Sequence, residues 1–199
     1  MMTWFVVGAI LFGVIMGRWF IPEALTLYID PVTTLALCAM LVGIGIDIGS
    51  KRETWGKLWE MGVKVFLVPV LVAVGSLAGA AAGGTIMGMP LNESTAIGAG
   101  FGWYSLSGVL LAKIYSVETG ALAFLTNVAR ELIAFLIIPL LAARTIGVVA
   151  VAPGGATTMD TTLPLIARVT DPETAIIAVV NGLVLSSMVP ELVPLFISL

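Results

Sequence analysis

Long apolar stretches separated by short polar links dominate the pattern of the chain. Each continuous stretch is long enough for a helix that spans the hydrocarbon core of a bilayer, which takes about 20 apolar residues. The pattern therefore predicts an all-α integral membrane protein. The continuous stretches are residues 3–20, 31–49, 61–85, 119–143 and 173–199.

Two further apolar segments, residues 95–114 and 147–169, are interrupted by helix-breaking residues. Broken backbone at membrane depth is tolerated where it is buried in protein or lines a cavity, as in transporters. If both segments cross the membrane, the chain has about seven transmembrane segments; re-entrant hairpins are the alternative. The first segment contains Gly98, Gly100, Gly102 and Gly108, and the second contains Pro153, Gly154 and Gly155.

Basic residues are distributed unevenly between the links, which indicates the orientation. Lys51, Arg52 and Lys57 lie between the second and third stretches, so the positive-inside rule makes this link cytoplasmic. Seven crossings then leave the amino terminus in the cytoplasm and the carboxyl terminus outside. We expect hairpins to put Lys113 and Arg168 outside, which the rule disfavours. The first stretch lacks the flanks of a cleaved signal peptide, so we expect it to remain as a span.

The broken segments and the stretches that follow them align with each other at a shift of 55 residues. We therefore expect one transmembrane domain over residues 1–199, with three amino-terminal spans in 1–90 and repeat units in 95–144 and 147–199. Each unit is a broken helix followed by a continuous one, and two crossings per unit make the copies parallel. The aligned pairs include Gly100 with Gly155, Lys113 with Arg168, Glu118 with Glu173, Thr119 with Thr174, and Pro139 with Pro194.

Composition supports the membrane assignment and excludes several functions. Of the 199 residues, 59% are hydrophobic and 11% charged, and the mean hydropathy is +1.12. The absence of His and the single Cys, Cys38, argue against Ser-His or Cys-His catalysis, a disulfide framework and a metal cluster. The net charge of -3 argues against nucleic-acid binding. We expect neither an enzyme nor a resident cofactor.

Glu131 is the ionisable residue that most needs an explanation, because an intramembrane charge costs about 2.5–3.5 kcal/mol on insertion scales. Asn127 lies four residues earlier and shares its helix face, whereas Arg130 points to a different face. The interpretation we favour is a cavity-facing carboxylate for a cationic substrate or a proton. A structural ion pair with a base on another span is the alternative.

Further polar residues accompany the breaks. Asp160 lies within the sequence TTMDTT at 157–162, typical of either a hydrophilic cavity wall or an interfacial loop. Asp47 is either a gate or a plain interfacial residue, and Tyr104 is either a pathway residue or part of an aromatic belt. Asp47 and Asp160 also suggest an intramembrane aspartyl protease, which the spacing at Gly45-Ile46-Asp47 disfavours. A membrane subunit without transport activity is a further alternative.

Three sequence blocks resemble the signatures of the LysO-type lysine exporter family. They are GFGWYSLSG at 100–108, NVARELIA at 127–134 and GATTMDTTLP at 155–164. A weaker similarity reaches back to residues 41–45, so the resemblance covers most of the chain.

The resemblance implies an inner-membrane exporter of L-lysine and its toxic analogues, driven by proton antiport. It also implies that the Glu of the second block, Glu131, is functional. Better-known family members are about half as long again, with additional amino-terminal spans that carry another intramembrane Asp. Asp47 is only its analogue by position, and a homodimer or a partner subunit is expected to supply the missing part.

A binding site for lysine needs anion-binding groups at one end and cation-binding groups at the other. We expect half-helix amino termini near Gly100 and Gly155 to face the carboxylate of lysine, and Glu131 and Asp160 to meet its ammonium groups. Another cationic amino acid as substrate, or Na⁺ as coupling ion, stays open. The expected binding residues are Glu131, Asp160, Asn127, Ser105, Ser107, Thr157, Thr158, Tyr104 and Asp47, with Gly100, Gly102, Gly154 and Gly155 at the breaks.

Overall fold

The computed structural model describes residues 64–199 without a gap. Before them it describes residues 8, 12–13, 15–20, 28, 31–32, 35–36, 39, 42, 46 and 62. The chain divides into two compact units, Met1–Ser50 and Lys51–Leu199, which are considered separately. In the first unit residues 15–19 are helical. Asp47 lies outside the described residues. Most residues of the spans expected at 3–20 and 31–49 also lie outside them.

The second unit is helical, and its described residues contain no β-strand. Its elements are α4 (Lys64–Ile86), α5 (Leu91–Gly98), α6 (Tyr104–Ile114), α7 (Val117–Arg144), the 3-10 helix η1 (Gly147–Met159), α8 (Leu163–Val169) and α9 (Pro172–Ile197). Within the described chain, Val65–Ile86, α7 and α9 are long and apolar enough to cross a membrane. They confirm the all-α prediction and match the spans expected at 61–85, 119–143 and 173–199.

Side-chain caps fix where the two long carboxyl-terminal helices begin. The Ser116 hydroxyl accepts a hydrogen bond from the Thr119 N–H at 3.1 Å, so it caps α7. The Asp171 carboxylate accepts one from the Thr174 N–H at 2.9 Å, so it caps α9. Each bond satisfies a backbone donor that the first turn of a helix leaves without a partner.

The first broken segment turns back on itself. Glu93, near the start of α5, accepts hydrogen bonds from the Tyr115 hydroxyl and the Thr119 hydroxyl, both at 3.1 Å. Tyr115 follows α6 and Thr119 lies in the first turn of α7, so the start of α5 and the end of α6 lie side by side. Glu93 also raises the pKa of Tyr115 by its hydrogen bond and its charge, which keeps the phenol protonated as the donor.

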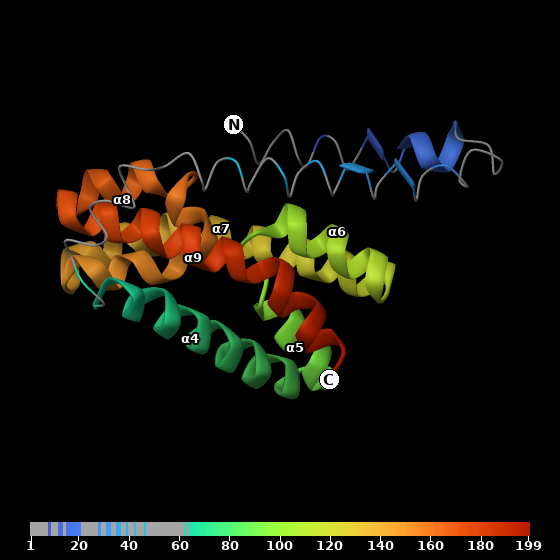
Figure 1. The fold of residues 1–199 in the computed structure, drawn as a ribbon, viewed down its shortest axis with the longest axis horizontal. Helices are drawn as coiled ribbons and strands as arrows, with labels where there is room; N and C mark the ends of the chain where they lie inside the picture. Colours follow the sequence, from blue (N-terminus) through green and yellow to red (C-terminus); the bar gives the residue numbers. More distant parts are fainter. Residues whose placement is uncertain are drawn as a thin grey trace. The chain divides into compact units, whose positions relative to one another are not determined.

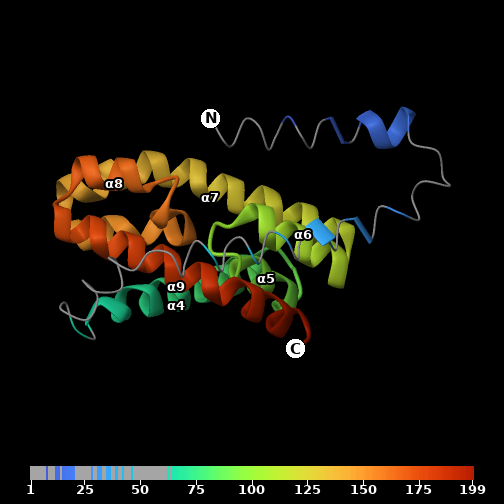
Figure 2. The same cartoon turned by 45° about the horizontal axis from the view of Figure 1, so that its top comes forward.

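The second broken segment turns back in the same way, at the other end of the unit. A Cβ added to Gly147, the first residue of η1, would lie 3.0 Å from the Thr174 hydroxyl and 3.2 Å from an Asp171 carboxylate oxygen. The start of η1 therefore lies beside the start of α9. Figures 1 and 2 show α5 and α6 toward the end that carries the carboxyl terminus, and α8 at the opposite end.

The expectation that both broken segments cross from one end to the other is therefore wrong for the described chain. The physical reason is arm length: α6 has 11 residues, about 16 Å of helix, roughly half of a bilayer core. Each segment enters, breaks and returns, forming hairpin 1 (α5 and α6) and hairpin 2 (η1 and α8). Hydropathy alone does not distinguish such a hairpin from a crossing.

Small residues bring the helices close together. An added Cβ at Gly98 in α5 would collide with Ala80 in α4. At the crossing of α6 and α7, an added Cβ at Gly108 would lie 3.2 Å from the Gly120 carbonyl. Close approach through small residues is the usual way that helices pack in lipid. A buried apolar cluster joins α7, hairpin 2 and α9: Ala134, Ile138, Ala150, Val151, Ile166 and Ala178.

Candidate functional site

The tips of the two hairpins meet in the interior of the second unit. The Ala156 N–H of hairpin 2 donates to the Phe101 carbonyl of hairpin 1 at 2.9 Å. Gly102 and Gly155 adopt φ angles of 98° and 58°, which side chains rarely allow. A Cβ at Gly155 would also collide with the Phe101 carbonyl. Two of the glycines predicted as breaks therefore allow the backbones of the two tips to approach each other.

Asn127 on α7 holds the tip of hairpin 1. Its carbonyl oxygen accepts from the Gly102 N–H at 2.7 Å, and its amide group donates to the Ala123 carbonyl at 2.9 Å and to Ser107 at 3.3 Å. The Ser107 hydroxyl in turn donates to the Trp103 carbonyl at 2.8 Å. Both predicted residues are buried, and these bonds give them a role in holding the tip.

Asn181 on α9 holds hairpin 2 in a comparable way. Its amide donates to the Gly155 carbonyl at 2.9 Å and to the Thr158 hydroxyl at 3.0 Å. The Thr158 hydroxyl lies 2.7 Å from the Ala178 carbonyl, and Thr157 donates to the Gly154 carbonyl at 2.8 Å. In the described chain the carbonyl oxygen of Asn181 is buried without a hydrogen-bond partner.

Glu131 lies on α7, one helical turn after Asn127. Its side chain is 1% exposed, and neither carboxylate oxygen has a hydrogen-bond partner among the described residues. A buried carboxylate without partners is costly. The ion pair weighed as the alternative is therefore not formed with any described base, and the carboxylate is a candidate ligand for a cation or a proton.

Asp160 follows η1 at the turn of hairpin 2 and is exposed. Its carboxylate accepts hydrogen bonds from the backbone N–H and the hydroxyl of Thr161. Asp160 lies near enough to Glu131 for their charges to interact, so the structure brings the two predicted carboxylates to the same region. Asp160 therefore lies at the exposed turn of hairpin 2 and near Glu131.

The other predicted residues lie at the base of the tips. Tyr104 is buried and packs edge-on against Phe124, with ring centroids 5.4 Å apart. Ser105 is half-buried in the first turn of α6. A Cβ at Gly100 would lie 2.6 Å from the Asn127 amide nitrogen, and one at Gly154 would lie 2.7 Å from the Thr162 hydroxyl.

One detail of the expected anion site is wrong. The helix after the second break does not begin near Gly155: η1 bends at that residue, and α8 begins only at Leu163. In hairpin 1 the helix after the break begins close to the expected place, at Tyr104, and it has no side-chain cap. The first turn of α6 is therefore the half-helix amino terminus at the tips.

Three residues at the tips were missed or given no role by the sequence interpretation: Asn181, Ser76 and Arg130. Asn181 repeats the signal of Asn127, an amide within an apolar helix next to a glycine-rich break. Ser76 lies in α4, and a single hydroxyl in an apolar helix does not by itself indicate a functional residue. For Arg130 the sequence predicts only a helix face different from that of Glu131.

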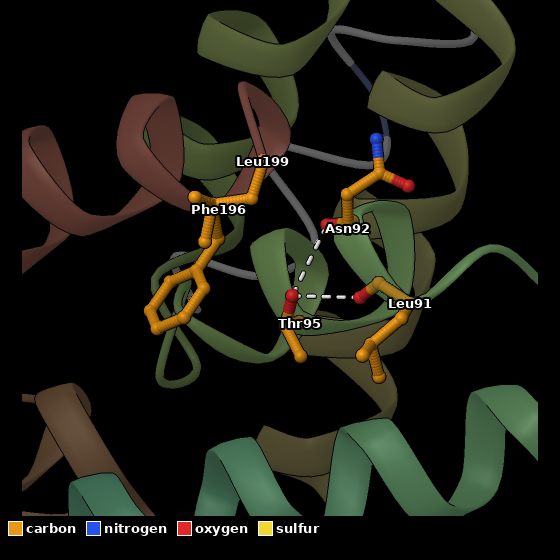
Figure 3. A pocket seen from close by; sticks show the side chains of 5 residues that line it. All are labelled: Leu91, Asn92, Thr95, Phe196 and Leu199. Carbon is orange, nitrogen blue, oxygen red and sulfur yellow. Dashed lines mark hydrogen bonds between the residues drawn. The ribbon is translucent and has the colours of Figure 1, made fainter.

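A cavity of about 380 Å³ lies away from the tips, between the start of α5 and the end of α9. Figure 3 shows its lining, which is mostly apolar: Leu91, Asn92, Thr95, Phe196 and Leu199. The Thr95 hydroxyl is used within α5, at 2.7 Å from the Leu91 carbonyl. None of the described side chains that line the cavity is a carboxylate.

Comparisons with known proteins identify the family of the chain. The family model described as lysine exporter LysO matches residues 7–197. Lysine exporter LysO of Escherichia coli (strain K12) is 39% identical over 82% of this chain and 53% of its own length, so the chain spans about half of that relative. A putative lysine exporter of Haemophilus influenzae is 26% identical over 96% of this chain and 95% of its own length. No solved structure matches the chain. The chain is a multi-pass membrane protein that belongs to the lysine exporter LysO family, which is a family of transporters and not of enzymes.

Proposed function

We propose that the chain is a secondary transporter that exports L-lysine across the inner membrane in exchange for protons. The observation that carries the proposal is Glu131, a carboxylate that is 1% exposed and without a hydrogen-bond partner in the described chain. A bound ammonium group or a proton would each remove the cost of this buried charge. Alternate binding of the two at one carboxylate couples their movements.

The hairpin tips supply the other half of the site. The first turn of α6 has no side-chain cap, and the first N–H groups of a helix lack partners within the helix. The Tyr104 N–H donates to the Gly102 carbonyl at 3.1 Å; in our proposal the following N–H groups, of Ser105 and Leu106, face the α-carboxylate of lysine together with the Ser105 hydroxyl. Glu131 and Asp160 meet the two ammonium groups, and no metal or organic cofactor takes part.

The two hairpins also support an internal repeat, in inverted rather than parallel form. Ser116 and Asp171 cap their helices from positions 55 residues apart, and each accepts from a Thr three residues later. Because each hairpin returns to the end at which it entered, α7 and α9 run in opposite directions. Inverted repeats with a site at the interface of discontinuous helices are typical of secondary transporters.

The orientation expected from the basic residues is compatible with hairpins. With hairpins, Arg144 and Arg168 lie at the end where α4 begins, and the basic link at 51–57 precedes α4 in the sequence, whereas Lys113 lies at the opposite end. The expectation that hairpins put Arg168 outside was therefore wrong, and hairpins satisfy the positive-inside rule as well as seven crossings do. We propose a cytoplasmic amino terminus and an external carboxyl terminus.

Reconstitution tests the transport proposal. The purified full chain is placed in proteoliposomes, and uptake of labelled lysine is measured under an imposed pH gradient, with arginine and ornithine as competitors. Glu131→Gln is expected to abolish proton-coupled exchange, because an amide neither binds a proton nor attracts an ammonium group. Glu118→Gln is the matched control, since Glu118 is exposed in the first turn of the same helix.

Other outcomes identify the alternatives. Exchange that requires a Na⁺ gradient and ignores the pH gradient would replace protons as the coupling ion. Stronger competition by arginine or ornithine than by unlabelled lysine would change the substrate. Activity that appears only with a second polypeptide would show a partner subunit, whereas cross-linked pairs of active chains would show a homodimer. Full exchange by the Glu131→Gln variant would refute the proposed role of Glu131.

A further inference from the structure

Each nitrogen of the Arg130 guanidinium group donates a hydrogen bond to a backbone or hydroxyl oxygen around the hairpins. Its Nε donates to the Pro153 carbonyl at 3.2 Å and its Nη2 to the Ala152 carbonyl at 3.4 Å. Its Nη1 donates to the Ser76 hydroxyl at 2.8 Å, and that hydroxyl donates to the Gly98 carbonyl at 3.0 Å. One side chain on α7 therefore connects α4, hairpin 1 and hairpin 2.

The carbonyl groups that Arg130 reaches, directly in hairpin 2 and through the Ser76 hydroxyl in hairpin 1, share one property. Gly98 is the last residue of α5, and Ala152 and Pro153 lie in η1 just before its bend at Gly155. The last carbonyls of a helical arm lack partners within the arm and carry a partial negative charge. Arg130 thus brings a fixed positive charge to the ends of both entering arms.

Two glycines leave room for this side chain. A Cβ at Gly155 would lie 2.8 Å from Nη2 of Arg130, and a Cβ at Gly102 would lie 3.7 Å from its Cδ. These are the glycines with positive φ at the two tips. The breaks, the contact between the tips and the position of the guanidinium are therefore one arrangement.

We propose that Arg130 is a positioning residue, a tethered cation that holds the entering arm of hairpin 2 directly by its carbonyl oxygens and that of hairpin 1 through Ser76, and so fixes the tips beside Glu131. Carbonyls of broken helices are also the groups that coordinate Na⁺ in some transporters. Here a covalently attached charge occupies them, so the closed tips do not depend on a bound metal cation. The relevance of this arrangement to lysine transport rests on the proposed function, but its geometry does not.

Amide hydrogen exchange measured by mass spectrometry on the purified full chain tests the proposal without any transport assay. The variants are Arg130→Gln and Arg130→Lys, with Arg168→Gln on α8 as a control that removes an exposed charge. Arg130→Gln is expected to speed exchange about tenfold or more at Ala156, whose N–H bonds to the other tip, and at Gly102, whose N–H bonds to Asn127 on α7, because hydrogen bonds from charged donors are among the stronger ones. Exchange in the middle of α9 should not change.

Arg130→Lys should restore part of the protection, because lysine keeps the charge but lacks the planar fork of donors. Wild-type protection should be equal in sodium and choline chloride. Unchanged protection of the tips in Arg130→Gln, or a requirement for Na⁺ in the wild type, would overturn the proposal.

Transport then separates positioning from direct substrate binding. A positioning role predicts that Arg130→Gln lowers the maximal rate more than it raises the KM for lysine. If Arg130 instead binds the carboxylate of lysine, the variant would keep its tip protection and lose discrimination between lysine and its decarboxylated analogue cadaverine. A chain that does not transport lysine would refute the proposed function and leave the hydrogen-exchange test of Arg130 intact.

Discussion

Neighbouring residues on α7 carry out different tasks at the hairpin tips. Arg130 donates hydrogen bonds to carbonyl oxygens, whereas the carboxylate of Glu131 is buried without a hydrogen-bond partner in the described chain. The two side chains leave the helix about 100° apart, so their charges do not neutralise each other. The unpaired acid is therefore the group that we propose as the ligand-binding one, and the neighbouring base the one that we propose as positioning.

Gly155 should be the least replaceable residue at the tips. Gly155→Ala forces a Cβ onto the Phe101 carbonyl and onto a φ of 58°, which costs about 1–3 kcal/mol before the collision is counted. We expect a large fall in melting temperature in detergent. Gly79→Ala is the matched control, because nothing lies within 4 Å of a Cβ there; it should be neutral or slightly stabilising. Equal effects of the two substitutions would contradict this account.

Asn127 should contribute more to stability than its exposed neighbour on α7. Asn127→Ala leaves the buried Gly102 N–H without its acceptor, which costs about 1–3 kcal/mol. Thr126→Ala, at an exposed position, should stay within about 0.5 kcal/mol of the wild type. Thermal or denaturant unfolding of the purified variants measures the difference, and similar values for both would rule out a special role of the amide.

At the scale of the elements, the caps of α7 and α9 differ in chemistry although they occupy corresponding positions. The cap of α7 is a hydroxyl and that of α9 a carboxylate, so of these two caps the one on α9 is titratable. Hydrogen bonds from Thr174 hold the pKa of Asp171 below its ordinary value. A lowered pKa means that the stabilisation by Asp171 is complete above the pKa that this group has in the unfolded chain. The stabilisation disappears as the pH falls through the pKa of Asp171 in the folded chain.

Asp171→Ala is therefore expected to lower the melting temperature at neutral pH, and the difference from the wild type should shrink below about pH 4. Asp171→Asn keeps a capping side chain without a titratable group, so it should stay close to the wild type at neutral pH and show less pH dependence. Melting curves between about pH 3 and 8 check both. A difference that grows as the pH falls would show that another group controls this end of the molecule.

The sequence pattern predicts the continuous helices well but not the path of the broken ones. The span expected at 119–143 is α7 at Val117–Arg144, and the span expected at 173–199 is α9 at Pro172–Ile197. Hydropathy places these helices because each must be apolar over a full bilayer. A broken apolar segment of similar length has the same hydropathy whether it crosses or returns, and only the contacts of Glu93 and Gly147 distinguish the two.

The residues of the candidate site can likewise be predicted only in part from the sequence. Glu131 and Asn127 stand out because polar groups in apolar helices need partners or ligands. The contacts of Arg130 follow from where the arms of the hairpins end, which residue spacing does not give. Asn181 carried the same signal as Asn127, and the comparison between the repeat units would have found it at a shift of 54 rather than 55 residues.

For the whole molecule, the path of the hairpins decides on which side of the membrane each link lies. Hairpins place the link between α6 and α7 on the side opposite to the basic link at 51–57, and the link after α7 on the same side as it. Seven crossings predict the reverse for both links. The orientation of α7, and with it the direction from which Glu131 is approached, therefore depends on this choice.

Cysteine labelling with a membrane-impermeant maleimide distinguishes the two paths in intact cells. In a Cys38→Ser background, single cysteines replace Val117 and Ile146, which are 71% and 74% exposed, and Thr54 provides the reference within the basic link. The hairpin arrangement predicts labelling from outside at position 117, and labelling at 146 and 54 only after the cells are opened. Because both test positions flank the same helix, they must exchange sides together. Labelling of position 146 from outside, with 117 and 54 protected, would restore the crossings, and Glu131 would then lie on a helix of opposite direction.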